Sequence, residues 1–341
     1  MKIAILEPGA WGTSLGILLE KRNQVRFWYE DKKLALRIDR FRENEKLAGI
    51  KIPEKIFISS DLEKTIRNAD LIIVASPSFN FRKTLLKLKR FRAVPVLLGI
   101  AKGIEKETLK LPSQIIEEIF GKISYAHLSG PGFAREIIRG RLAKEVIASK
   151  DENFLKNLKE LFQIKPLKIL TTTDLIGVQL DGAIKNVLAI GISLVEAAIQ
   201  NPEIRKIRPK LIKQGLKEMI KIGKAMGGKK ETFLGPAGKD DLILTSTSPF
   251  SRNFQFGKTL FLNAGKMRKD IQERKITVEG FDNTWALYKL SKKYKLNLPM
   301  LNEIYKVIYK KTSPEKTAKN LIELTTKPGN VDLVINFRKS S

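Results

Sequence analysis

Short apolar runs alternate with longer amphipathic stretches along the first half of the chain. Each run has the length of one strand and ends at a turn, whereas stretches such as 83–90 and 111–120 repeat apolar residues at helical spacing. The runs that predict strands are 2–6, 24–29, 71–75, 94–100, 124–128, 145–149 and 167–171. Strands that alternate with helices form a parallel sheet covered on both faces. The pattern therefore predicts an α/β, Rossmann-type doubly wound sheet.

The pattern changes after residue 173, where strand-length runs give way to apolar residues at helical spacing. The predicted helices are 174–201, 208–226, 253–273, 283–295 and 300–311. We therefore divide the chain into a sheet domain at 1–173, an all-α domain at 174–325 and a tail at 326–341. We find no signal peptide and no apolar run of the length that a bilayer requires, so we expect a cytoplasmic protein without an integral membrane segment.

Composition narrows the chemistry that this chain can carry. It has no cysteine and one histidine, His127, which lies at the end of a predicted strand and is expected to be structural. Disulfides, thiol nucleophiles and clusters of histidine or cysteine are therefore excluded, and we expect no metal site. An acid or base in this protein has to be a lysine, aspartate, glutamate or tyrosine.

The charge of the chain is strongly positive, with 64 Lys and Arg against 36 Asp and Glu and a net charge of +28. The positive residues are spread through several helices, as in 206–224 and 289–295, and are not gathered with aromatic residues into one platform. This distribution is typical of a solvated surface, and we expect no nucleic-acid partner. A positive field would also attract anionic small molecules.

Lys185 and Asn186 stand among apolar residues in the segment 181–191, inside the longest predicted helix. Neighbouring positions on such a helix are expected to be buried, and burial lowers the pKa of an ammonium group. A lysine in that state can exchange a proton at neutral pH. The alternative is a lysine whose stem lies along the core while its head group reaches water.

The segment 7–12, EPGAWG, joins the first predicted strand to a helix. Such a turn presents backbone N–H groups and the helix dipole to a phosphate. Glu7 stands where a dinucleotide fingerprint has its first glycine, and Pro8 after it predicts an extended backbone at Glu7. Glu30 follows the second strand about twenty residues after the glycines, where a carboxylate commonly binds ribose hydroxyls. This incomplete fingerprint alone is weak evidence for a dinucleotide site.

Eight short segments carry a resemblance to one enzyme family through their sequences and their order. They are WGT at 11–13, RENEKLAGIKIP at 42–53, KGIE at 102–105, SGPGFAREI at 129–137, GAIKNV at 182–187, FLGPAGKDDLILT at 233–245, SRN at 251–253 and VEG at 278–280. Together they resemble the bacterial NAD(P)-dependent glycerol-3-phosphate dehydrogenases over roughly residues 1–310.

The resemblance implies reduction of dihydroxyacetone phosphate to sn-glycerol 3-phosphate, the glycerol backbone of phospholipids, by hydride transfer from NADH or NADPH. It implies that the sheet domain binds the dinucleotide and the helical domain the substrate, with Lys185 as proton donor and Lys102 polarising the carbonyl. The substrate-binding residues it implies are Lys102, Gly130, Lys185, Asp241, Ser251, Arg252 and Asn253. The cofactor-binding residues are Gly9, Trp11, Gly12, Glu30, Lys102, Ala134, Arg252, Thr277 and Glu279.

The Glu30 carboxylate favours NAD(H), because it would repel the 2′-phosphate of NADP(H), although a nearby lysine would leave NADP(H) usable. The phosphorylated substrate is a small molecule, and a homodimer is left open.

Four positions depart from the family's pattern. Glu7 replaces a glycine, Glu30 an arginine, Gly132 a serine or threonine, and Asp240 a glycine. The residues implied in the chemistry are intact, namely Lys102, Lys185, Asp241, Arg252 and Asn253. We therefore interpret the chain as an active enzyme with an altered cofactor site. The alternatives are an inactive or regulatory nucleotide-binding paralogue and a related dehydrogenase for another anionic ketone.

Overall fold

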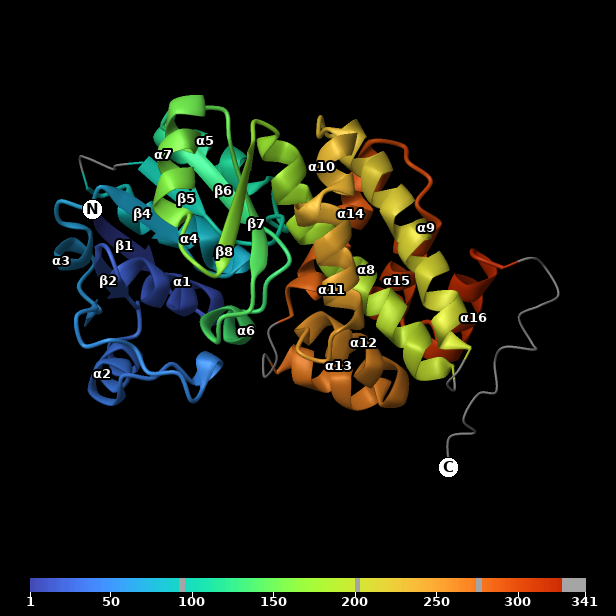
Figure 1. Cartoon of the computed structure of the whole chain (residues 1–341). Coiled ribbons are helices and arrows are strands. Elements are labelled where there is room, and N and C mark those ends of the chain that lie inside the picture. Colours follow the sequence, from blue (N-terminus) through green and yellow to red (C-terminus); the bar gives the residue numbers. More distant parts are fainter. Residues whose placement is uncertain (92–95, 200–202, 274–277, 327–341) are drawn as a thin grey trace. The chain divides into compact units, whose positions relative to one another are not determined.

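The computed structural model describes residues 1–91, 96–199, 203–273 and 278–326 (Figure 1). The chain forms two compact units. The first contains Met1–Lys102 and Lys110–Gln179, and the second contains Gly103–Leu109 and the chain from Leu180 onward. Most of the predicted tail, from residue 327, lies outside the described residues.

The first unit is built on one eight-stranded sheet in the order β3-β2-β1-β4-β5-β6-β7-β8. The strands are β1 (Lys2–Leu6), β2 (Gln24–Trp28), β3 (Phe57–Ser59), β4 (Leu71–Val74), β5 (Val96–Gly99), β6 (Tyr125–Ser129), β7 (Ala143–Ser149) and β8 (Leu167–Thr172). The strand order reverses direction at β1 and β4, which gives the sheet the switch point of a doubly wound fold. The predicted fold class is confirmed.

Two features of the sheet differ from the sequence prediction. The short strand β3 was not predicted, because three residues carry too little periodicity. The pairing of β6 with β7 is antiparallel, with Leu128 opposite Ile147, while the other strand pairs are parallel. The direction of a strand cannot be read from a run of apolar residues. Residues 94 and 95 of the strand predicted at 94–100, which is β5, lie outside the described part of the chain.

Helices cover both faces of this sheet. All four residues of β4 are buried, although successive side chains on a strand point to opposite faces. Leu71 and Ile73 share one apolar cluster with residues of α1 and α7. The helices of this unit are α1 (Ala10–Glu20), α2 (Lys32–Phe41), α3 (Leu62–Ile66), α4 (Phe81–Leu88), α5 (Pro112–Phe120), α6 (Ala134–Ile138) and α7 (Glu152–Phe162), with short 3₁₀ turns at Glu45–Leu47 and Ser78–Asn80.

The second unit is helical. Its elements are α8 (Leu175–Ala198), which begins in the first unit, α9 (Ile204–Ala225), α10 (Lys230–Leu234), a π-helical turn (Pro236–Asp240), α11 (Asp241–Thr247), α12 (Arg252–Leu262), α13 (Ala264–Gln272), α14 (Glu279–Lys293), α15 (Pro299–Tyr309) and α16 (Pro314–Glu323). The single helix predicted at 253–273 is wrong. Asn263 ends α12, and its side-chain oxygen accepts a hydrogen bond from the Lys266 N–H, which caps the start of α13.

Helix α8 is long and apolar enough to cross a membrane by length and composition, which corrects the expectation that no segment reaches this length. The expectation counted uninterrupted apolar runs, whereas α8 carries polar residues such as Gln179 and Lys185 within an apolar helix. In the protein, 94% of its most apolar window is buried. The helix is therefore shielded by other parts of the protein, as the core helix of a folded domain is.

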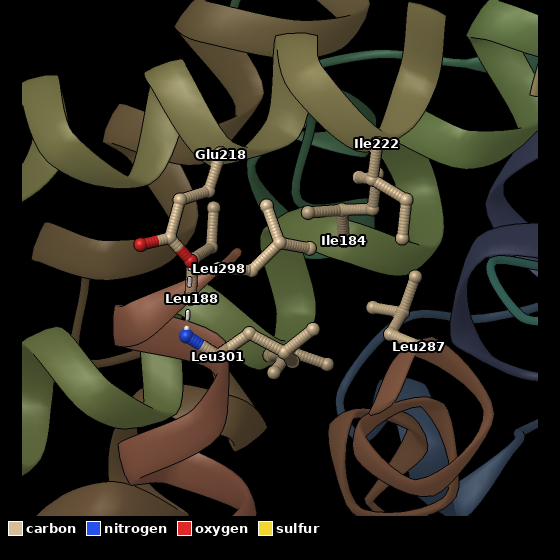
Figure 2. A pocket seen from close by; sticks show the side chains of 8 residues that line it. Ile184, Leu188, Glu218, Ile222, Leu287, Leu298 and Leu301 are labelled. Atoms are coloured by element: carbon tan, nitrogen blue, oxygen red, sulfur yellow. Dashed lines mark hydrogen bonds between the residues drawn. The ribbon is translucent and has the colours of Figure 1, made fainter. Parts of the chain in front are cut away.

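A small cavity of about 10 Å³ lies among the helices of the second unit (Figure 2). It is lined by Ile184, Val187, Leu188, Glu218, Ile222, Leu287, Leu298 and Leu301. The one carboxylate in this lining, Glu218, accepts hydrogen bonds from the N–H groups of Met300 (2.8 Å) and Leu301 (3.0 Å), so it caps the start of α15. Burial raises the pKa of Glu218. The cavity has room for about one water molecule and is part of the packed core, not a ligand site.

Candidate functional site

The turn between β1 and α1 has the form of a phosphate-binding turn. Gly9 precedes the first turn of α1, and no side chain among the described residues caps that helix. A Cβ atom added to Gly9 would come no closer than 4.0 Å to another heavy atom, the Cδ of Lys46, so the space in front of the helix is open. Gly12 packs closely, since its Cβ would lie 2.9 Å from the Cβ of Ala75. Exposed amides at a helix start and a close helix-to-strand contact fit a dinucleotide pyrophosphate.

The backbone at Glu7 is not extended, and the prediction drawn from Pro8 is wrong. Glu7 has φ +54°, in the left-handed region that favours glycine. Its N–H donates to the Trp28 carbonyl (2.8 Å), and its Oε1 accepts from the Glu30 N–H (2.5 Å). These two bonds join the end of β1 to the end of β2 and offset the cost of the left-handed backbone. The half-buried carboxylate has a raised pKa, chiefly because of desolvation.

Asn44 forms hydrogen bonds with the same turn and was not recognised as part of the site from sequence. Its buried side-chain amide donates to the Pro8 carbonyl (3.0 Å) and to Oγ1 of Thr13 (2.9 Å). The Tyr29 hydroxyl also donates to the Pro8 carbonyl (3.3 Å). The segment at 42–53 carried the resemblance, but nothing in its pattern indicated which residue it contacts.

Glu30 lies at the end of β2, as predicted, and is paired with two lysines of α4. Its Oε1 is 2.6 Å from the Lys87 Nζ and 3.0 Å from the Lys83 Nζ. The hydrogen bonds from Lys87 and then Lys83 lower the pKa of Glu30, so its carboxylate is ionised at neutral pH. Two carboxylates, Glu7 and Glu30, and two ammonium groups thus lie at the end of β2.

The carboxyl ends of the central strands carry further polar atoms of the first unit. The buried hydroxyls of Ser76 and Ser129 have no hydrogen-bond partner within the described part of the chain. Lys102 Nζ donates to the Gly130 carbonyl (3.1 Å). Ala134 is joined to α1 through its carbonyl, which accepts from Ser14 (3.1 Å).

Trp11, at the start of α1, is half-buried and packs against the apolar core of the first unit. The predicted cofactor residues of this unit therefore gather on the edge where an open parallel sheet binds its ligands.

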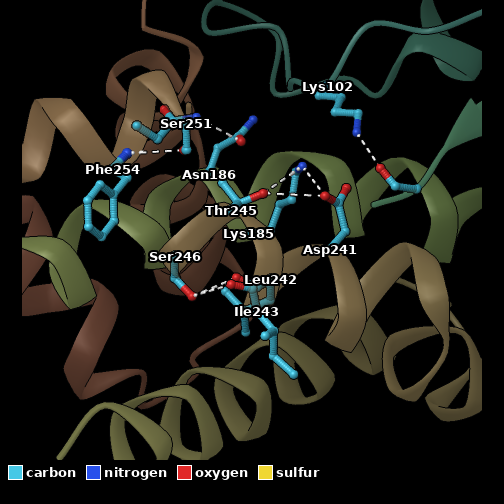
Figure 3. Close-up of polar contacts among 12 residues, drawn as sticks. Lys102, Lys185, Asn186, Asp241, Leu242, Ile243, Thr245, Ser246, Ser251 and Phe254 are labelled. Carbon is cyan, nitrogen blue, oxygen red and sulfur yellow. Dashed lines mark hydrogen bonds and ion pairs between the residues drawn. The ribbon is translucent and has the colours of Figure 1, made fainter. Parts of the chain in front are cut away.

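Lys185, on α8, has its ammonium group buried, with only 5% of the residue exposed (Figure 3). Its Nζ lies 2.6 Å from Oδ1 of Asp241 and donates to Oγ1 of Thr245 (3.0 Å). The alternative in which the lysine head group reaches water is therefore wrong. The Asp241 carboxylate stabilises the charged ammonium and opposes the cost of burying it.

Helix α11 positions both partners of Lys185. Asp241 begins the helix and Thr245 lies one turn later, so both side chains face the same side, and Thr245 donates to Oδ1 of Asp241 (3.3 Å). Thr245 was not predicted as a site residue. Asp240, which replaces a glycine of the family, is exposed and has right-handed helical angles (φ −69°, ψ −38°), so an aspartate is accommodated there without backbone strain.

The same unit contains a second series of hydrogen-bonded polar side chains, next to Lys185 in sequence. The side-chain amide of Asn253 donates to Oδ1 of Asn186 (2.8 Å), and its Oδ1 accepts from the Gly280 N–H (3.0 Å). Ser251 caps α12 by accepting from the Phe254 N–H (3.2 Å).

Two further predicted residues of this unit lie at helix starts: exposed Arg252 begins α12, and half-buried Glu279 begins α14. Thr277 lies outside the described residues. Among the predicted substrate residues, Lys185 and Asp241 are thus in direct contact, and Ser251, Arg252 and Asn253 share one helix start.

Two family models match most of the chain. The N-terminal domain of NAD-dependent glycerol-3-phosphate dehydrogenase matches residues 2–155, and the C-terminal domain of the same enzyme matches residues 174–319. The chain belongs to the NAD-dependent glycerol-3-phosphate dehydrogenase family.

Its relatives extend over nearly the whole chain. Glycerol-3-phosphate dehydrogenase [NAD(P)+] from Janthinobacterium sp. (strain Marseille) is 36% identical over 94% of this chain and 97% of the relative. The enzyme of the same name from Hydrogenovibrio crunogenus is 33% identical over 94% and 95%. The crystal structure of glycerol-3-phosphate dehydrogenase from Coxiella burnetii matches with a TM-score of 0.88 at 29% identity, covering 94% of this chain and 98% of that chain.

Proposed function

We propose that this protein reduces dihydroxyacetone phosphate to sn-glycerol 3-phosphate, with NADH or NADPH supplying the hydride. The observation that carries the proposal is the buried contact between Lys185 and Asp241, supported by family membership. Reduction of a ketone requires a proton for the oxygen that becomes a hydroxyl. A lysine kept in its ammonium form in a dry environment is suited to donate that proton.

Each group of residues has a separate task in this proposal. Lys185 Nζ donates the proton, while Asp241 and Thr245 hold its ammonium group charged and in place. Lys102 polarises the carbonyl, and a positive group placed where oxygen gains negative charge lowers the barrier. Gly130, Ser251, Arg252 and Asn253 bind the substrate, with the Arg252 guanidinium suited to bidentate contact with phosphate.

The cofactor is assigned to the first unit's turn, with further contacts from the helical unit. The open amides at Gly9 and the close packing at Gly12 accommodate the pyrophosphate. The remaining proposed contacts are Trp11, Glu30, Lys102, Ala134, Arg252, Thr277 and Glu279. We place the enzyme in the cytoplasm, where its product supplies the glycerol backbone of phospholipids, and leave a homodimer to be tested by light scattering.

Loss of NADH absorbance on adding dihydroxyacetone phosphate to the purified protein tests the proposal. Turnover with this substrate supports it. Turnover only with other phosphorylated or carboxylated ketones would instead indicate a related dehydrogenase. Bound nucleotide without turnover would indicate an inactive or regulatory paralogue.

We expect NADH to be preferred over NADPH, because the Glu30 carboxylate opposes a 2′-phosphate. Glu30→Gln should reverse this trend, since Lys83 and Lys87 would then be available to the phosphate. A charged hydrogen bond is worth about 1.5–3 kcal/mol, so the ratio of kcat/KM should move toward NADPH roughly tenfold or more. Adding Lys87→Gln to this variant should remove the gain. A clear NADPH preference in the unaltered enzyme would contradict the assignment of Glu30.

Glu7→Gln should tighten NADH binding, because it removes a negative charge near the pyrophosphate. Glutamine can still accept the Glu30 N–H bond, so the turn is retained. A carboxylate about 8 Å from a phosphate charge costs about 2 kcal/mol at an effective dielectric near 20, before screening. Titration of cofactor fluorescence should show the gain at low salt and a smaller gain at high salt. Equal affinities of the two proteins at low salt would show that the carboxylate does not oppose the cofactor.

A further inference from the structure

A buried carboxylate occupies the turn that follows β6. Glu145, on β7, is 0% exposed. A Cβ atom added to Gly130 would lie 2.6 Å from Glu145 Oε2, and one added to Gly132 would lie 2.5 Å from Glu145 Oε1. Real Cβ atoms do not approach oxygen so closely, so the carboxylate fills the space that two glycines leave. Gly132, where the family has serine or threonine, is therefore explained by Glu145.

A cation approaches the same turn. Lys102 Nζ donates to the carbonyl of Gly130 (3.1 Å), the residue against which Glu145 Oε2 also lies. A carboxylate taken fully out of water costs several kcal/mol unless a positive group compensates it. Within the described part of the chain, Lys102 is the lysine that donates a hydrogen bond to this turn.

Other titratable groups around the turn lie on β6, β7 and α6. They are Tyr125 and His127 on β6, Lys144 on β7, and Arg135 and Glu136 on α6. Burial, and then the charge of Lys102, lower the pKa of His127 to about 3, so this histidine is neutral, and its Nδ1 lies 2.7 Å from the Tyr125 hydroxyl. Lys144 is exposed, and Glu136 is paired with Arg141.

We propose that Glu145 is a positioning residue for Lys102. Its carboxylate keeps the Lys102 ammonium group charged and holds it at the Gly130–Gly132 turn. This inference rests on the proposed function, in which Lys102 polarises the substrate carbonyl. Only a charged ammonium can do that. Gly132 and Glu145 are then matched to each other, because the small residue leaves room for the carboxylate.

The test measures the protonation of Lys102 directly. The full-length protein and its Glu145→Gln variant are labelled with acetic anhydride across a pH series, and acetylation of Lys102 is quantified by peptide mass spectrometry. Loss of an adjacent carboxylate should lower the labelling midpoint of Lys102 by about one pH unit or more. Lys144, exposed and next to Glu145 in sequence, is the matched control and should keep its midpoint. An unchanged Lys102 midpoint would overturn the proposal.

This readout does not depend on turnover, so failure of the inference is distinguishable from failure of the proposed function. If the enzyme is active, the deficit of Glu145→Gln in kcat should grow as pH rises, because its Lys102 loses a proton earlier. A merely structural role would lower kcat equally at every pH.

A paired substitution covers the case in which Glu145→Gln does not fold. Gly132→Ser alone should lower the melting temperature, since its Cβ meets Glu145 Oε1, whereas Gly132→Ser with Glu145→Val should recover it. The double variant should also show the lowered Lys102 midpoint. A Gly132→Ser protein as stable as the unaltered one, or a double variant with an unshifted midpoint, would contradict the proposal.

Discussion

Lys185→Met is expected to lower kcat for dihydroxyacetone phosphate by roughly 10²–10⁴-fold, the range that a positioned proton donor contributes. Methionine keeps the length and apolar stem of lysine but has no proton to give. Steady-state kinetics with NADH held at saturation measure the loss. Near-normal turnover would place the proton donor elsewhere, with Lys102 as the next candidate.

The same substitution is also expected to destabilise the protein. Removing Lys185 leaves the carboxylate of Asp241, which is 1% exposed, without its ammonium partner. Breaking a buried pair on one side typically costs about 3–5 kcal/mol. Asp241→Asn combined with Lys185→Met removes both charges, so urea unfolding should show recovered stability while kcat stays low. Recovery of kcat together with stability would mean that Lys185 acts only through the fold.

Seven of the eight strands were predictable, because most of their apolar runs are short, buried and followed by a turn. The run at β1 is a clear case, with four of its five residues buried. The turn after it was not predictable in detail. Pro8 biases Glu7 toward extended angles, but the bond from the Glu30 N–H to the Glu7 carboxylate, across 23 positions of sequence, favours the left-handed conformation instead. Tertiary contacts of this kind override a local preference.

The candidate site shows the same limit. Lys185 could be recognised because a lone lysine on an apolar helix is unusual, and that signal is local. Its contact with Thr245 spans 60 positions, and no periodicity in the chain connects the two. The family resemblance indicated Asp241 but not Thr245. It identified Gly132 as a departure without its cause, because Glu145 lies on β7, outside the segment that contains Gly132.

Arg252→Ala is expected to raise KM for dihydroxyacetone phosphate roughly 10- to 100-fold, since a hydrogen bond between charged groups is worth about 1.5–3 kcal/mol. Arg252 begins α12 at an exposed position, where alanine is well tolerated, so stability should change by no more than about 0.5 kcal/mol. Arg252→Lys keeps the charge but loses the bidentate geometry, so its KM should lie between the two.

The decisive comparison uses dihydroxyacetone, which lacks the phosphate. If Arg252 binds the phosphate, Arg252→Ala should reduce kcat/KM strongly for the phosphorylated substrate and little for the unphosphorylated one. Because the cofactor is the same in both assays, an effect on cofactor binding would reduce both values alike. Equal losses with the two substrates would therefore assign the guanidinium to the cofactor, and unchanged values with both would place the substrate phosphate on another cation.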